Sequence, residues 1–417
     1  MAAAALRSTW ARGWRFALGA ALGLSALSCG RGSGGGSGTM VSGSPPPSAA
    51  NVVDVVVDAG PAVLTSADVN IPFVTVTVCV PGTISCQTID HIEVDTASFG
   101  LRLMASVLSV KLPVQTAAAG ASLLECTQFV DGYSWGPVAL ADVKIAGESA
   151  GSVPVQVIGD PGFTTVPTNC SGSGKAEDTV AAFGANGLLG VGVFAQDCGA
   201  GCVSNAANGF YYACTASQCT AATALLTSQV TNPIALFAAD NNGVIIQIPT
   251  IPAQGSAAVT GSMIFGIDTQ TNNKSGGQSV LTVDPGSGEF TTILNGTTLA
   301  KSFLDTGSNG LYFTDSSIAQ CADTNFNGFY CPGSTLALSA LVVGQNGVSK
   351  TVNFQVANAQ ALLTDGPSFV AFATLAGTYT SSSQTFDWGL PFYYGRAVFT
   401  ALENATTAVG TGPYIAF

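Results

Sequence analysis

The hydrophobic residues of this 417-residue chain fall in short runs, which Gly, Pro, Ser and Asn interrupt. Residues 89–94 and 302–304 are examples, in which an alternating or apolar run leads directly into a polar turn. After residue 30, no run reaches the roughly 18 to 20 apolar residues that a membrane-spanning helix needs. The pattern therefore predicts an all-β protein built from many short strands and turns.

The N-terminus has a different pattern. Three arginines precede an apolar stretch at 16–27, which predicts a secretory signal peptide over residues 1–29 and not a spanning helix. Its end, Ser28-Cys29, resembles a bacterial lipobox, which implies lipidation of Cys29 and a membrane anchor. Cleavage by an ordinary signal peptidase is the alternative. Residues 30–50, rich in Gly, Ser and Pro, predict a flexible tether.

Charged residues are scarce, with 12 Lys+Arg and 24 Asp+Glu making up 9% of the chain. Because the net charge is −12, no basic surface is expected, and nucleic acid is not expected as a partner. His91 is the only histidine, which excludes most Ser/His/Asp and Cys/His hydrolases and every multi-histidine metal site. We therefore expect neither a metal site nor a cofactor.

The cysteines predict a disulfide framework. Without Cys29, an even number of the 11 cysteines remains, as is typical of exported proteins. Short spacings predict pairs Cys79 with Cys86 and Cys321 with Cys331. Spacing leaves the pairing of the other six open: Cys126, Cys170, Cys198, Cys202, Cys214 and Cys219. A zinc site built from the last four is a further alternative.

One short segment occurs twice. Residues 94–103 and 304–313 share Asp, Thr, Ser, Gly and Leu at matching positions, and Asp95 and Asp305 lie 210 residues apart. A repeat of this kind predicts two similar lobes, at 51–240 and 241–417. Each aspartate directly follows a short strand, so each is expected where a strand turns.

The two segments resemble the active-site loops of pepsin-like aspartic peptidases, whose signature is Asp-Thr-Gly-Ser/Thr once in each lobe. Leu188-Leu189-Gly190 and Trp388-Gly389-Leu390 resemble the strands that cross behind these loops. Residues 128–136 resemble the flap, a hairpin that closes over bound peptide. The resemblance implies an all-β, bilobal fold with a central cleft. A closer resemblance is to bacterial exported proteins known only as a domain of unknown function.

The resemblance implies that Asp95 and Asp305 share one proton, one acting as base on a water and the other as acid. It does not say which does which. The neighbouring residues would support the pair: threonines hydrogen-bonding across to the opposite loop, serines donating to their own aspartate, and the backbone N–H after each threonine. These are Thr96, Ala97, Ser98, Thr306, Gly307 and Ser308. Ala97 departs from the glycine of the family.

The flap also departs from the family. Its substrate-binding residues would be Phe129, Asp131, Gly132 and Tyr133. Phe129 stands where the family has a tyrosine, and Arg102 stands where it has the tryptophan that holds this tyrosine. The two changes predict a rebuilt flap, in which Tyr133 or Trp135 takes over. Acids outside the repeat are expected in turns or loops: Asp160, Asp240, Asp268, Asp284 and Asp387.

We therefore expect an exported, monomeric aspartic endopeptidase in the periplasm or at the cell surface, anchored by lipid and cleaving peptide or unfolded protein. The first alternative is an inactive lipoprotein of the same fold that binds peptide or cell-wall ligands. The second is a glycoside hydrolase, in which the two carboxylates would stand farther apart.

Overall fold

The computed structural model describes residues 49–117, 120–129, 132–215 and 218–417. The predicted signal peptide with Cys29 and nearly all of the predicted tether lie outside the described residues, as does Asp131 of the flap. In the part of the chain that is described, no helix has the length and apolar character needed to cross a membrane.

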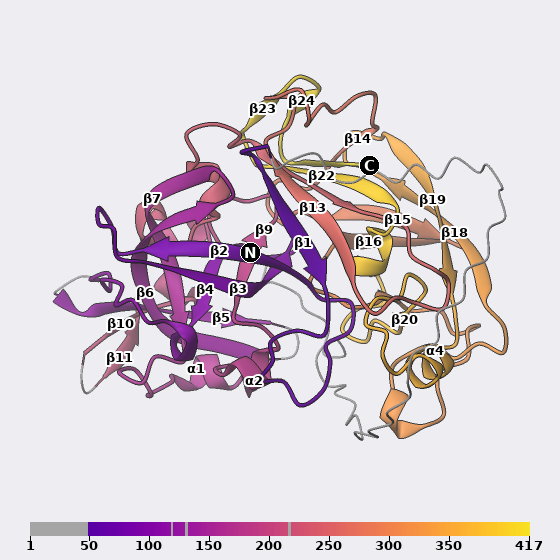
Figure 1. The fold of residues 1–417 in the computed structure, drawn as a ribbon, viewed down its shortest axis with the longest axis horizontal. Helices are drawn as coiled ribbons and strands as arrows, with labels where there is room; N and C mark the ends of the chain where they lie inside the picture. The colour runs from indigo at the N-terminus through magenta and orange to yellow at the C-terminus, as the bar shows by residue number, and fades with distance from the viewer. Residues whose placement is uncertain (1–48, 118–119, 130–131, 216–217) are drawn as a thin grey trace, which may run out of the picture.

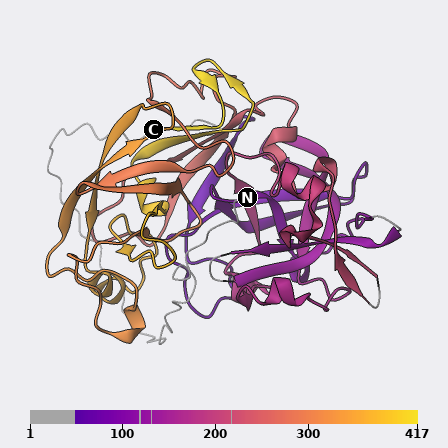
Figure 2. The same cartoon turned by 180° about the vertical axis from the view of Figure 1, so that it is seen from behind.

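Two β-rich lobes lie side by side, indigo to magenta and orange to yellow in Figure 1, and seen from behind in Figure 2. The prediction of an all-β, bilobal fold is confirmed. The strands up to residue 240 are β1 (Val52–Val57), β2 (Pro72–Cys79), β3 (Cys86–Asp95), β4 (Phe99–Met104), β5 (Ser122–Gln128), β6 (Gly132–Ile145), β7 (Glu148–Ile158), β8 (Lys175–Ala176), β9 (Gly187–Val191), β10 (Tyr211–Cys214) and β11 (Cys219–Ala221).

The second lobe contains the remaining strands: β12 (Gly243–Ile248), β13 (Val259–Phe265), β14 (Val280–Thr282), β15 (Phe290–Leu294), β16 (Thr297–Leu304), β17 (Leu311–Phe313), β18 (Leu336–Val343), β19 (Ser349–Val356), β20 (Ala376–Gly377), β21 (Phe386–Trp388), β22 (Arg396–Ala401), β23 (Thr406–Thr407), β24 (Gly410–Thr411) and β25 (Tyr414–Ala416). Helices are short: η1 (Ala105–Val107), α1 (Thr168–Ser171), α2 (Val180–Phe183), α3 (Ala200–Ser204), η3 (Ala206–Asn208), η4 (Leu226–Ser228), η5 (Pro233–Leu236), η6 (Thr324–Phe326), α4 (Ala359–Asp365) and η7 (Leu390–Phe392).

The lobes share one long sheet. Its strand order is β11-β10-β5-β6-β7-β4-β9-β3-β2-β1-β13-β12-β22-β25-β14, with β8 beside β6. Strand β1 joins the two halves, because it pairs with β13 along its whole length and with β2 at Val56 and Val57 (Figure 1). The first described strand is thus held between strands of both lobes.

The same three-strand unit occurs in each lobe. In the first lobe, β3 pairs in parallel with β9, and β4 returns antiparallel to β9. In the second lobe, β16 pairs in parallel with β21, and β17 returns antiparallel to β21. β16, β21 and β17 lie in a separate sheet of order β19-β18-β15-β16-β21-β17-β20. The repeat in the sequence therefore corresponds to a repeated unit of structure.

Glycines let the returning chain pass close to each crossing strand. A Cβ atom on Gly190 would lie 2.4 Å from the Phe99 nitrogen, and one on Gly389 would lie 2.1 Å from the Gly310 oxygen. Real Cβ contacts are never this short, so any side chain here would force the backbone to move. This explains the glycine in both crossing-strand motifs.

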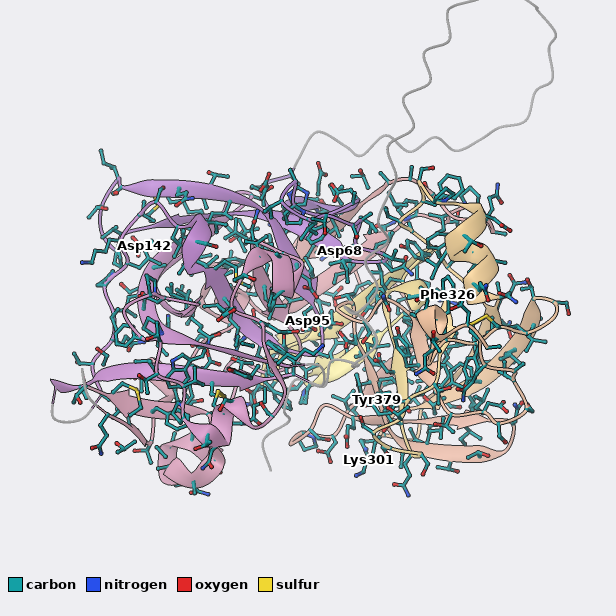
Figure 3. The ribbon with its side chains drawn as sticks, turned by 90° about the horizontal axis from the view of Figure 1, so that it is seen from below. Asp68, Asp95, Asp142, Lys301, Phe326 and Tyr379 are labelled. Atoms are coloured by element: carbon teal, nitrogen blue, oxygen red, sulfur yellow. A yellow bond between two sulfur atoms is a disulfide. The ribbon has the colours of Figure 1, made fainter. Side chains whose placement is uncertain are left out.

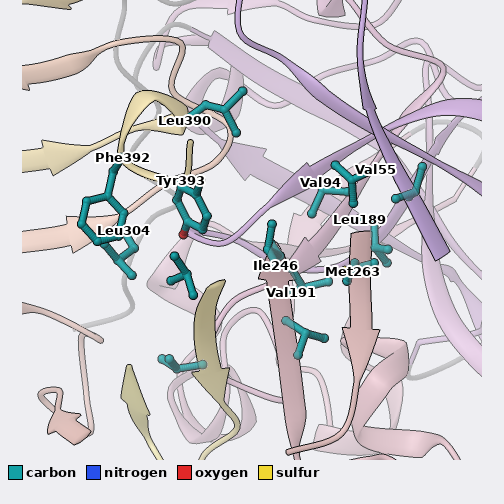
Figure 4. Close-up of a cluster of buried hydrophobic side chains, with 14 of the residues drawn as sticks. Val55, Val94, Leu189, Val191, Ile246, Met263, Leu304, Leu390, Phe392 and Tyr393 are labelled. Carbon is teal, nitrogen blue, oxygen red and sulfur yellow. The ribbon is translucent and has the colours of Figure 1, made fainter. Parts of the chain in front are cut away.

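The largest apolar cluster of the core takes residues from both lobes. Val94, Leu189 and Val191 reach it from the first lobe, and Leu304 and Phe392 from the second (Figure 4). The end of β3 is buried on both faces, as its last four residues show, so the strand carries its final carboxyl groups into the interior.

Five disulfides confirm the predicted framework. They join Cys79 to Cys86, Cys126 to Cys170, Cys198 to Cys202, Cys214 to Cys219, and Cys321 to Cys331. The two pairs predicted from spacing are among them. The zinc alternative is wrong, because the four cysteines it needs are paired as two disulfides. Such a framework is typical of proteins from an oxidising compartment.

Candidate active site

The two predicted catalytic aspartates meet between the lobes. Asp95 is the last residue of β3, and Asp305 directly follows β16. Figure 3 shows Asp95 at the boundary between the lobes. Both side chains are 0% exposed.

Two threonines join the loops reciprocally. The backbone N–H of Thr96 donates to Thr306 Oγ1 at 3.1 Å, and the N–H of Thr306 donates to Thr96 Oγ1 at 3.0 Å. The Thr96 hydroxyl donates to the Leu304 carbonyl at 3.1 Å, and the Thr306 hydroxyl donates to the Val94 carbonyl at 2.7 Å. These carbonyls belong to the residues just before the two aspartates, so the four bonds fix the spacing of the carboxyl groups.

Each aspartate accepts the same two hydrogen bonds within its own loop. Oδ1 of Asp95 accepts from the Ala97 N–H at 2.7 Å, and Oδ2 accepts from the Ser98 hydroxyl at 2.7 Å. In the second loop, Gly307 and Ser308 donate to Asp305 at 2.8 and 2.9 Å. Such donors stabilise a carboxylate.

Alanine at position 97 is compatible with this arrangement. Ala97 is not among the residues with a left-handed backbone, so its Cβ carries no conformational strain. Its methyl group packs against an apolar cluster of the second lobe that includes Phe303 and Tyr312. The departure from the family therefore costs the first loop no hydrogen bond.

Gly307 marks the point where carboxyl groups converge. A Cβ atom on this residue would lie 3.1 Å from Asp305 Oδ1, 3.2 Å from Asp95 Cγ and 3.1 Å from Glu93 Oε1. Glu93 is fully buried on β3, two residues before Asp95, and was not predicted as a site residue. Its position in the same strand, on the face of Asp95, was the available signal.

Asp387 is a fourth carboxyl group near the pair, and its prediction as a loop acid is wrong. It lies in β21, is 0% exposed, and its Oδ2 is 2.7 Å from Ser308 Oγ. Burial raises the pKa of Asp387 well above its ordinary value, the charge of Asp95 raises it further, and Ser308 opposes this. An acid inside the apolar strand segment 386–388 was the signal that sequence reasoning missed.

Tyr393 supports the first loop from the second lobe. Its hydroxyl is 3.0 Å from Thr96 Oγ1. Because Thr96 donates its one hydroxyl proton to Leu304, Tyr393 must be the donor in this contact. Burial raises the pKa of Tyr393, which keeps the phenol protonated.

The segment predicted to be the flap joins β5 and β6, which pair antiparallel, and the Phe129 N–H donates to the Gly132 oxygen at 2.7 Å. Phe129 packs against Phe183 of α2. Tyr133 and Trp135 pack in a cluster with the cysteines that join β5 to α1. The packing of all three rings is thus with the first lobe.

Arg102, where the family has a tryptophan, lies in a buried ion network. Its guanidinium is 2.6 Å from Glu125 and 3.2 Å from Asp197, and Tyr211 donates to Asp197 at 2.6 Å. Burial alone would lower the pKa of Arg102, but the two carboxylates raise it. Burial and Glu125 raise the pKa of Asp197 well above its ordinary value. The network joins four separate segments of the chain, so no local pattern reveals it.

His91 lies apart from these groups, between Asp58 and Asp90 at 3.4 Å from each. Within the described ranges, no group of three or more His, Cys, Asp or Glu side chains is arranged to hold a metal ion.

Comparisons with known proteins bear on the fold and the family of this chain. In all, 213 chains of solved structures match this chain. One is the crystal structure of the aspartic proteinase from Irpex lacteus, with a TM-score of 0.52 and 15% sequence identity, over 88% of this chain and 96% of that chain. At this identity the likeness shows the fold, and it confirms the predicted pepsin-like architecture. None of the curated proteins compared with the chain matches it.

The profile of a protein family of unknown function (DUF3443) matches residues 47–417. The chain belongs to this family, as its resemblance to a domain of unknown function predicted.

Proposed function

We propose that this protein is an exported aspartic endopeptidase in which Asp95 and Asp305 form the catalytic pair. One observation carries the proposal: the reciprocal bonds of Thr96 and Thr306 hold two identically hydrogen-bonded aspartates at one point between the lobes. Asp305 Oδ1 and Asp95 Cγ lie 3.1 and 3.2 Å from the Cβ position of Gly307, so both carboxyl groups border the same small space.

The chemistry follows from this closeness. Asp95 and Asp305 would share one proton, because two neighbouring carboxyl groups resist being ionised at once; aspartic proteases are the established example. The ionised member takes a proton from a water, which attacks the peptide carbonyl carbon. The protonated member donates to the carbonyl oxygen, and a later proton transfer to the nitrogen releases the amine.

The N-terminal segment and the disulfides support export. The five disulfides are typical of an oxidising compartment, and the signal-like segment 1–29 supplies a route out of the cytoplasm. We further propose that lipid on Cys29 anchors the protein in a bacterial membrane. The substrate would be an extended peptide or unfolded protein, bound through its main chain.

The test is cleavage of an unfolded protein by the purified mature chain between about pH 3 and pH 8. We expect wild-type protein to cut the substrate and Asp305→Asn to lose at least about 1,000-fold in rate, because Asn can neither accept nor release the shared proton. Equal rates for the two proteins at every pH would contradict the proposal. Asp160→Asn, in a surface loop, is the matched control.

A second candidate is an inactive binder of peptide or cell-wall ligands. The observation that favours it is the 0% exposure of both Asp95 and Asp305, which a substrate reaches only after neighbouring groups move. Binding of an unfolded peptide without cleavage, unchanged by Asp305→Asn, would support this second candidate over the first.

A further inference from the structure

Ser308 is shared between two carboxyl groups. Its Oγ is 2.9 Å from Asp305 Oδ2 and 2.7 Å from Asp387 Oδ2. In the first loop, the equivalent Ser98 bonds to Asp95 at 2.7 Å, and the residue that corresponds to Asp387 on the crossing strand is Leu188. The second loop therefore has an additional acid that the first loop lacks at this place.

The number of protons determines the direction of these two bonds. A hydroxyl has one proton, so Ser308 can donate to only one of the two oxygens. The other short contact is a hydrogen bond only if that carboxyl group carries a proton and donates it to Ser308 Oγ. One of Asp305 and Asp387 is therefore protonated on the oxygen that faces Ser308.

The surroundings assign this proton to Asp387. Asp305 accepts a second bond from the Gly307 N–H, which suits an ionised carboxylate. Asp387 is 0% exposed, and its Oδ1 is buried without a hydrogen-bond partner among the described residues. An ionised carboxylate in this environment would carry a large desolvation cost. Burial correspondingly raises the pKa of Asp387.

Among the described residues, no cation faces Asp387 to offset this cost. The groups that face it are Asp305 at the end of β16, Asp95 of the first loop, and the phenols Tyr379 and Tyr393. Tyr312, which pairs with Asp387 across β17 and β21, directs its hydroxyl to Asn309. Glu289 adds a further negative charge near Tyr379. Each of these groups is an acid or a phenol.

We propose that Asp387 is a positioning residue that keeps its proton, donates it to Ser308, and thereby directs the Ser308 hydroxyl onto Asp305. The proposal rests on the proposed function, because it concerns the same catalytic pair. Its consequence is a specific pH limit. When Asp387 ionises, two carboxylates compete for the one proton of Ser308. Activity then falls as the pH rises.

The first test is the pH profile of kcat/KM for Asp387→Asn. Asparagine donates through Nδ2 to Ser308 and cannot ionise, so it imitates the protonated acid. We expect rates within about 3-fold of wild type at acid pH and an upper limb shifted to higher pH by about one unit or more. Asp387→Leu, of similar size but without a donor, should lose about 10-fold. An unshifted upper limb in Asp387→Asn would overturn the proposal.

Ser308→Ala tests whether Asp387 acts on Asp305 through the Ser308 hydroxyl. If Asp387 acts through Ser308, adding Asp387→Asn to Ser308→Ala should leave the pH profile of the single variant unchanged. A shift of the same size in both backgrounds would show that Asp387 acts by charge alone and would contradict the proposal.

A second measurement needs no activity. Infrared spectra at about pH 6, well above the ordinary pKa of aspartic acid, should show a protonated carboxylic acid band in folded wild type that Asp387→Asn lacks. Absence of this difference would overturn the proposal even if Asp387→Leu fails to fold. If no variant cleaves any substrate but the band is present, the proposed function fails while the proton on Asp387 stands.

Discussion

The two aspartate loops are alike in how they hold their carboxyl groups and different in what surrounds them. Each loop has an N–H donor to Oδ1, a serine donor to Oδ2, and a threonine that bonds to the opposite loop. These bonds use only residues within the repeated segment. The shared part of the two loops is therefore encoded locally.

Two of the differences come from the segment of the second lobe at 386–393. Tyr393 donates to Thr96 of the first loop, and Asp387 bonds to Ser308 of the second. The additional buried acid also lies at a different position of the paired strands in each lobe. In the first lobe Glu93 pairs with Leu188, whereas in the second lobe Phe303 pairs with Asp387. Each three-strand unit thus buries one acid besides its loop aspartate, but on a different strand.

This comparison shows how a nearly symmetric pair acquires two unequal members. The threonine bonds set the spacing of the carboxyl groups, and both loops contribute to it equally. The additional hydroxyl and acid groups set the proton environment, and they act unequally on Asp95 and Asp305. Changes to the threonine bonds should affect stability. Changes to the additional hydroxyl and acid groups should affect the pH dependence of activity.

The largest predicted effect is on stability, and it differs between the two threonines. Thr96→Val removes partners from Leu304, Thr306 and Tyr393, so we expect the free energy of unfolding to fall by about 3 kcal/mol. Thr306→Val removes two such partners and should cost about 2 kcal/mol. Denaturant unfolding measures both values.

The control for this difference is Tyr393→Phe, which removes the third partner of Thr96 in advance. In that background the two threonine variants should cost the same. Equal costs in the wild-type background would contradict the inequality of the loops.

A smaller effect is expected at the residue after each threonine. Gly307→Ala places a methyl group 3.1 to 3.2 Å from three carboxyl groups, which must shift by a few tenths of an ångström. We expect kcat/KM to fall by about 10-fold. Ala97→Gly keeps the N–H donor and should lower kcat/KM by only about 2-fold, with a stability loss of roughly 0.5 to 1 kcal/mol. A rise in activity for Ala97→Gly would instead identify its methyl group as an obstacle.

The sequence predicted the fold because the information was local and repeated. Short apolar runs predicted strands, and the matched segments around Asp95 and Asp305 predicted two lobes. Gly190 and Gly389 stood in the expected crossing motifs because the chain returns too close to them for any side chain. The short cysteine spacings predicted two disulfides for a similar reason, since one turn of the chain can bring together two cysteines that are close in sequence.

The remaining features depend on distant contacts. Asp387 lacks a repeated context, and its contact with Ser308 joins residues 79 positions apart. Arg102 meets Asp197 across 95 positions, so its charge could not be predicted to be buried and paired. Sequence patterns report periodicity and turns well, but they do not report which polar groups are brought together inside a core.

The most direct measurement of the central claim is a double-mutant cycle on the pair itself, using kcat/KM for cleavage of an unfolded substrate. We predict that Asp95→Asn and Asp305→Asn each lower the rate by about 10,000-fold, and that the double variant is no worse than either single variant, because the two groups act as one unit. Losses that multiply, or a single variant that keeps wild-type activity, would contradict the account.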